Sequence, residues 1–94
     1  MDLATLSQMQ VSAPPTSALE AAVGNTPLLP LKRLAQGISP RVQVLAKAEW
    51  FNPGGSVKDR PALNILRTAL AEGRLEGGKP LLDSTSGNMG ISYA

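Results

Sequence analysis

The chain is 94 residues long, has nine Lys or Arg against seven Asp or Glu, and carries a formal net charge of +2. This length allows one small domain and excludes a complete two-domain enzyme. Hydrophobic residues make up 43% of the chain and aromatic residues 3%, which is typical of an α/β chain with an aliphatic core. Because cysteine and histidine are absent, the sequence excludes disulfides, cysteine-ligated zinc and Ser-His-Asp or Cys-His catalysis, and it indicates no metal site.

The basic residues are scattered and do not alternate with aromatic side chains, so nothing in the sequence favours nucleic-acid binding. No apolar run approaches the roughly 20 residues needed to span a bilayer. Residues 1–17 contain no Lys or Arg and fit neither a signal peptide nor a transit peptide. We therefore expect a cytoplasmic protein that does not bind membranes.

The first third of the chain predicts short elements. Residues 1–16 are polar and weakly patterned, and we expect a disordered or loosely attached arm there. The capping-box spacing of Ser17 and Glu20 predicts a helix that ends at Gly24. Pro30 interrupts the next apolar run, so that run is extended or an edge strand. Residues 32–36 could form one helical turn.

Residues 42–50 give the clearest strand pattern, because apolar residues alternate along it from Val42 to Trp50. A loop follows, and then a helix to Glu72 with an apolar stripe at three- and four-residue spacing. Its N-cap could be Ser56 or Asp59, and only the second places Pro61 inside the first turn, where proline is tolerated. In both cases Lys58 sits at the amino-terminal end of the helix.

The end of the chain predicts a short buried strand at 81–85, a small-residue loop at 86–90 and the beginning of a helix at 91–94. The order strand, helix, strand implies a right-handed crossover and an open parallel sheet. Two or three parallel strands cannot cover both faces of such a sheet. We therefore expect residues 17–94 to be the amino-terminal part of a larger α/β enzyme.

Two loops, at 52–58 and 86–90, should leave the carboxyl ends of adjacent strands, where open α/β folds bind ligands. Both are rich in Gly and Ser, so that their amides can approach an anion. Lys58 opposes the dipole of its helix, which favours the neutral amine needed for Schiff-base chemistry. A tight turn at 54–55 and a solvated surface lysine remain the alternative interpretations.

Three motifs, VGNTPL at 23–28, NPGGSVKDR at 52–60 and TSGNMGI at 85–91, occur in order and at consistent spacing. Together they strongly resemble the amino-terminal part of the cysteine synthase and cystathionine β-synthase family, over about residues 18–94. The resemblance implies pyridoxal 5′-phosphate as cofactor and the tryptophan-synthase-β fold, also called fold type II.

The resemblance also implies roles for individual residues. Lys58 matches the lysine that forms a Schiff base with pyridoxal phosphate and later acts as general acid and base at the substrate α-carbon. Asn88 matches the residue that hydrogen-bonds the cofactor's 3′ oxygen. The loop that holds the substrate α-carboxylate corresponds to Thr85, Ser86, Gly87, Asn88 and Met89. The family usually has Thr where this chain has Met89, and a helix cap is the plainer interpretation of the same loop.

The implied reaction is β-replacement on an activated serine, with O-acetylserine or O-phosphoserine and sulfide giving cysteine. Alternatives are a cystathionine β-synthase, a serine or threonine dehydratase-type lyase, or an inactive fragment or binding module. In the family, the Gly-rich loop for the cofactor phosphate and the partner of the pyridine nitrogen come later in the chain than Ala94. The resemblance therefore implies that the 94-residue chain is inactive in isolation. Because the family is commonly dimeric, it also implies a homodimer at full length.

Overall fold

The computed structural model describes residues 17–94, and the arm expected at 1–16 lies outside this range. The first described element is helix α2 (Ala18–Ala21). Its start follows the predicted cap, because the Oγ of Ser17 accepts a hydrogen bond from the Glu20 N–H at 3.2 Å. Gly24 has a φ of +85°, the left-handed conformation predicted at the end of this segment.

The sheet is an antiparallel pair of short strands, β1 (Leu28–Pro30) and β2 (Leu45–Lys47). Leu28 lies opposite Lys47, and Pro30 lies opposite Leu45, so proline occupies an edge strand as predicted. The segment between them consists of turns, within which the Ala35 N–H donates to the Leu31 carbonyl at 3.0 Å.

The strand predicted at 42–50 is shorter than expected. The predicted alternation is present in its middle, where Ala46 is half-buried between exposed Leu45 and Lys47, and Ala48 is fully buried. The Ala48 N–H still donates to the Pro27 carbonyl at 2.9 Å. The chain then forms a 3-10 helix, η1 (Glu49–Phe51). Trp50, at the end of the predicted strand, is therefore not paired with β1.

The predicted parallel sheet does not form among residues 17–94. Residues 81–85 are assigned to no strand, and the sheet within the described range is the antiparallel pair β1 and β2. Leu82 is 94% exposed, not buried. A parallel strand needs a neighbour on at least one side, and no described strand lies beside 81–85 to supply one. The small α/β architecture is thus confirmed, whereas the predicted parallel βαβ unit is not found within this range.

Helix α3 (Asp59–Ala71) is the longest element of the described chain. Lys58 occupies its N-cap position, so the helix begins one residue before the start predicted with Asp59 as cap. Pro61 falls within the first turn, where its missing N–H costs nothing. Gly73, with a φ of +70°, follows the last turn as predicted. Of the predicted apolar stripe, Ala62 is buried, whereas Leu70 is 64% exposed.

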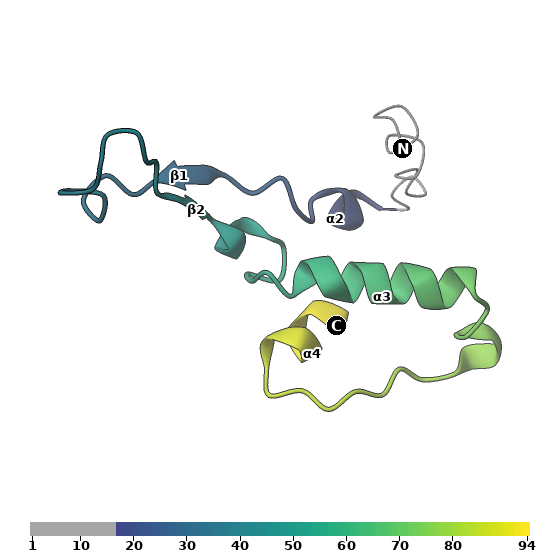
Figure 1. Cartoon of the computed structure of the whole chain (residues 1–94). Coiled ribbons are helices and arrows are strands. Elements are labelled where there is room, and N and C mark those ends of the chain that lie inside the picture. The colour runs from purple at the N-terminus through teal and green to yellow at the C-terminus, as the bar shows by residue number, and fades with distance from the viewer. Residues whose placement is uncertain (1–16) are drawn as a thin grey trace, which may run out of the picture.

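A 3-10 helix, η2 (Glu76–Gly78), and an extended segment lead from α3 back to helix α4 (Asn88–Tyr93). Helix α4 begins earlier than the start predicted at Ile91. Figure 1 shows α4 beside the first turns of α3, while β1 and β2 project away from both helices. The packing of α4 against α3 brings the end of the chain next to the start of α3.

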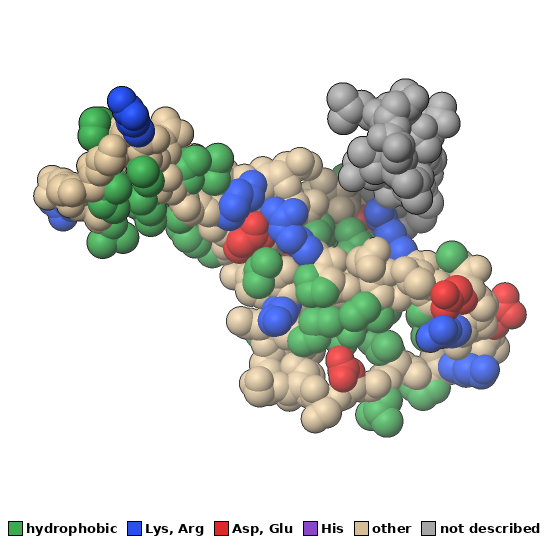
Figure 2. All heavy atoms as spheres, viewed as in Figure 1, with side chains coloured by type: hydrophobic (Ala, Val, Ile, Leu, Met, Phe, Trp, Pro, Cys, Tyr) green, Lys and Arg blue, Asp and Glu red, His purple; other side chains and the backbone are tan. Residues whose placement is uncertain are grey.

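The core is very small. Ala48 and Ala62 are the buried apolar residues of the described range, and no large side chain in that range is fully buried. Figure 2 shows hydrophobic side chains on the surface of the β1–β2 arm and beside α3. Trp50 and Phe51 are each 62% exposed, with ring centroids 5.9 Å apart. The radius of gyration is 17.7 Å, compared with about 12 Å for a compact domain of this length.

Candidate active site

The loop that carries Lys58 begins at Asn52, whose side chain is only 3% exposed. Its Oδ1 accepts a hydrogen bond from the Gly24 N–H at 2.8 Å. Its Nδ2 donates to two oxygens of Glu49, the carbonyl at 2.9 Å and Oε2 at 2.7 Å. Because a buried amide with three partners has one orientation, Asn52 fixes the start of the loop against the turn at Gly24.

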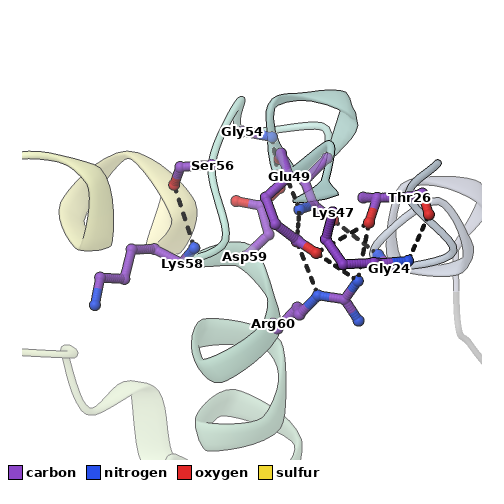
Figure 3. A network of polar contacts seen from close by, with 10 residues as sticks. Gly24, Thr26, Lys47, Glu49, Gly54, Ser56, Lys58, Asp59 and Arg60 are labelled. Atoms are coloured by element: carbon purple, nitrogen blue, oxygen red, sulfur yellow. Dashed lines mark hydrogen bonds and ion pairs between the residues drawn. The ribbon is translucent and has the colours of Figure 1, made fainter. Parts of the chain in front are cut away.

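A second set of contacts fixes the other end of this loop (Figure 3). The Arg60 guanidinium donates to both carboxylate oxygens of Glu49, each at 2.9 Å, and to the Thr26 hydroxyl at 3.2 Å. The Thr26 hydroxyl in turn donates to Glu49 at 2.9 Å. The hydrogen bonds from Arg60 are the main reason that the pKa of Glu49 falls to about 2. This bidentate ion pair ties the first turn of α3 to η1.

Lys58 lies between these two anchors and is not held by them. Its backbone N–H donates to the Ser56 hydroxyl at 3.2 Å, which shapes the last turn before α3. Its side chain is exposed, and Figure 3 shows it extending away from the Glu49–Arg60 ion pair. The amine is therefore presented to the exterior at the start of a rigidly anchored helix.

The loop before α4 is organised by Thr85. Its Oγ1 accepts hydrogen bonds from the Gly87 N–H at 3.2 Å and from the Gly90 N–H at 3.1 Å. A Cβ at Gly90 would lie 2.9 Å from the Thr85 methyl group, so glycine permits this close approach. The N-cap of α4 is Gly87, with no side-chain cap of its own, and Thr85 instead accepts an N–H of the first turn from two residues before the cap. The Thr85 hydroxyl proton remains available to a ligand.

Lys58 and this loop line the same cavity, which has a volume of about 440 Å³. Every residue that the sequence analysis selected for the site takes part in it. The lining consists of Lys58, Ser84, Thr85, Ser86, Gly87, Asn88 and Met89. Residues about 30 positions apart in the sequence therefore meet at one open, mostly polar cavity. Lys58 is the positively charged side chain in its lining.

Sequence reasoning missed three kinds of residue. Ser84 lines the cavity but precedes the loop that was selected. The network of Thr26, Glu49 and Arg60 was not anticipated. Asp59 was considered only as a cap, yet it is 5% exposed and accepts hydrogen bonds from two other segments. Contacts between residues more than 30 positions apart, such as Thr26 with Arg60 and Asp59 with Ser92, leave no periodic pattern in the sequence.

Two negative findings apply to residues 17–94. No helix in this range is long and apolar enough to cross a membrane. The same range holds no cluster of three or more His, Cys, Asp or Glu residues that could bind a metal ion.

Comparison with known proteins gives consistent matches. The family model described as pyridoxal-phosphate dependent enzyme matches residues 19–94. Cysteine synthase from Aquifex aeolicus is 53% identical over 73 residues, which is 77% of this chain and 22% of that protein. Cysteine synthase 1 from Emericella nidulans is 47% identical over 78 residues, covering 83% of this chain and 20% of its own length.

Cystathionine beta-synthase from Saccharomyces cerevisiae is also 47% identical, over 73 residues that make up 77% of this chain and 14% of that protein. The chain thus spans about a fifth, or less, of the length of these relatives. The family match includes both Lys58 and the 84–89 loop, the two walls of the cavity. By this match, the chain belongs to the family of pyridoxal-phosphate-dependent enzymes.

Proposed function

We propose that the protein carrying this chain catalyses β-replacement on an activated serine, combining O-acetylserine or O-phosphoserine with sulfide to give cysteine. The observation that carries the proposal is that Lys58 and the 84–89 loop line one cavity. The cysteine synthases from Aquifex aeolicus and Emericella nidulans, at 53% and 47% identity, support this reaction class.

The residues of the cavity suit pyridoxal phosphate. Its volume of about 440 Å³ lies in the range of small-molecule sites. Lys58 offers the one amine, with which it would hold the cofactor covalently, and the Asn88 side chain would hydrogen-bond the ring oxygen. When bound, the cofactor supplies an electron sink for a carbanion at the substrate α-carbon.

The remaining residues would bind and orient the amino acid. The hydroxyls of Thr85 and Ser86, together with Gly87 and Asn88, would hold the α-carboxylate. Met89 places a thioether at the edge of this group, where it offers no O–H donor. The Lys58 amine would move the proton at the substrate α-carbon once the carboxylate is held. The proposal thus gives proton transfer to Lys58 and substrate binding to the loop.

Reduction with borohydride tests the assignment of Lys58. In the intact protein loaded with pyridoxal phosphate, we expect peptide mapping to find the reduced pyridoxyl group on Lys58. Lys47 and Lys79 serve as internal controls, because neither lines the cavity and the Lys47 ammonium donates to the Thr26 carbonyl. A pyridoxyl group on either control lysine, with Lys58 unmodified, would contradict the proposal.

The competing activities share these residues, so only turnover separates them. The yeast cystathionine beta-synthase matches the same part of the chain as the cysteine synthases. Cysteine formation from O-acetylserine and sulfide supports the proposal. Replacement with another thiol would favour a cystathionine β-synthase, and loss of ammonia without any thiol would favour a dehydratase. A labelled Lys58 without turnover would indicate an inactive fragment or a binding module.

We further propose that residues 17–94 form the amino-terminal part of a fold-type II catalytic domain with an open parallel sheet. The extended segment 81–85 would pair there with strands from outside residues 17–94. The 94% exposure of Leu82 supports this, because strands of parallel sheets are covered on both faces. The resemblance also supports a homodimer, which sedimentation of the intact protein tests.

A further inference from the structure

Asp59 follows Lys58 directly and is 5% exposed. A carboxylate is rarely buried without partners, since leaving it unpaired in the interior is costly. Asp59 has two: the Gly54 N–H donates to Oδ2 at 2.6 Å, and the Ser92 hydroxyl donates to Oδ1 at 2.5 Å. Both contacts are short, and the hydroxyl distance is that of a charge-assisted hydrogen bond.

The two donors belong to the two segments of the chain whose other residues line the cavity. Gly54 lies in the loop that leads to Lys58, whereas Ser92 lies in α4, whose first residues line the opposite wall. Asp59 and Ser92 are 33 residues apart in the chain. A single carboxylate group therefore joins the segment that carries the amine to the segment that carries the hydroxyls.

The contact with Gly54 depends on the absence of a side chain there. A Cβ built at Gly54 would collide with the Asp59 carboxylate. Glycine at this position is consequently what lets the backbone amide reach the buried oxygen. Neither Asp59 nor Ser92 lines the cavity of about 440 Å³, so neither is placed to touch a ligand bound there.

We propose that Asp59 is a positioning residue whose carboxylate fixes the distance between Lys58 and the 84–89 loop. The geometry needs both hydrogen bonds: the one to Gly54 holds the carboxylate beside the lysine loop, and the one from Ser92 holds α4. Its consequence for ligand binding rests on the proposed function, because it assumes that both walls act on one bound amino acid.

The test removes one hydroxyl. Ser92→Ala deletes the donor from α4 and leaves the contact between Asp59 and Gly54 intact. Ser92→Thr keeps the hydroxyl, and a neighbouring cavity of about 290 Å³ that Ser92 lines has room for the added methyl group. Ser17→Ala is the matched control, because it makes the same chemical change at the cap of α2, away from the cavity.

Two measurements are made on the intact protein. Amide hydrogen exchange reports how firmly α4 is held, and the half-saturating concentration of O-acetylserine reports the cavity, read from the visible absorbance of the bound cofactor. In Ser92→Ala we expect the exchange rate of the α4 amides and the half-saturating concentration each to rise at least about tenfold, the lower end for losing a hydrogen bond to a charged group. The fraction of Lys58 that borohydride labels should not change.

Ser92→Thr should restore both quantities, and Ser17→Ala should leave both at the wild-type level. If α4 exchanges no faster in Ser92→Ala than in the Ser17→Ala control, the carboxylate does not hold α4 and the proposal is wrong. If exchange rises but half-saturation does not, α4 is held without positioning the loop, which also overturns it. If borohydride never labels wild-type Lys58, the proposed function fails, while hydrogen exchange at 84–93 still decides the role of Asp59.

Discussion

Replacing Asn52 with alanine removes three hydrogen bonds at once: one from the Gly24 N–H and two to Glu49. A hydrogen bond of this kind contributes about 1 kcal/mol net, and Asn52 is only 3% exposed, so water does not readily replace it. We therefore expect the free energy of unfolding to fall by about 3 kcal/mol. Asn52, Gly24 and Glu49 do not line the cavity, so the expected loss of stability comes from the contacts that hold the start of the loop.

Urea unfolding of the intact protein, followed by far-ultraviolet circular dichroism, measures this loss. With a denaturant slope of about 2 kcal/mol per molar, a loss of about 3 kcal/mol lowers the midpoint by about 1.5 M. Asn64→Ala is the matched control, because Asn64 is exposed on α3 and makes no side-chain hydrogen bond within the described range. A midpoint shift for Asn52→Ala no larger than the control's would refute the anchoring role.

Two further predictions concern the 84–89 loop, under the proposed function, and the Glu49–Arg60 ion pair. Met89→Thr should lower the half-saturating concentration of the amino acid severalfold, because it adds one O–H donor. Cofactor labelling of Lys58 should stay constant. Loss of labelling in a folded variant would show that the loop has been assigned to the wrong part of the site. The pKa of Glu49 is lowered from 4.5 to about 2, so its contribution to stability is complete above about pH 4.5 and is lost as the pH falls through about 2. Urea midpoints across this range should therefore fall more steeply in the wild type than in Glu49→Gln, and parallel curves would contradict this.

Local signals in the sequence predicted the start of α2 and the end of α3, but not the starts of α3 and α4. Ser17 caps α2 and Gly73 follows α3, because a cap hydroxyl and a left-handed glycine act on the residues next to them. The structure also brings Lys58 and the 85–89 loop to one cavity, whereas the roles of these residues stay a prediction. Each of these features depends on a residue and its immediate neighbours.

The sheet could not be predicted in the same way. The apolar run at 81–85 reads as a strand, but a strand also needs a partner, and its pairing depends on residues far away in the chain. The contact between Thr26 and Arg60, 34 positions apart, is hidden for the same reason. A pattern in the sequence records how a segment can be buried but not which segment buries it.

The hydroxyl of Thr85 has a consequence for selectivity. Because its oxygen already accepts two backbone hydrogen bonds, the group can offer a ligand only its proton. A carboxylate can use that proton, whereas an ammonium group approaching the same atom finds no free lone pair. An oxygen that draws on the Thr85 proton also polarises the hydroxyl, which strengthens the two bonds from Gly87 and Gly90. Under the proposed function, a bound substrate carboxylate would therefore stabilise the first turn of α4, and the loop would be better ordered with the carboxylate bound than without it.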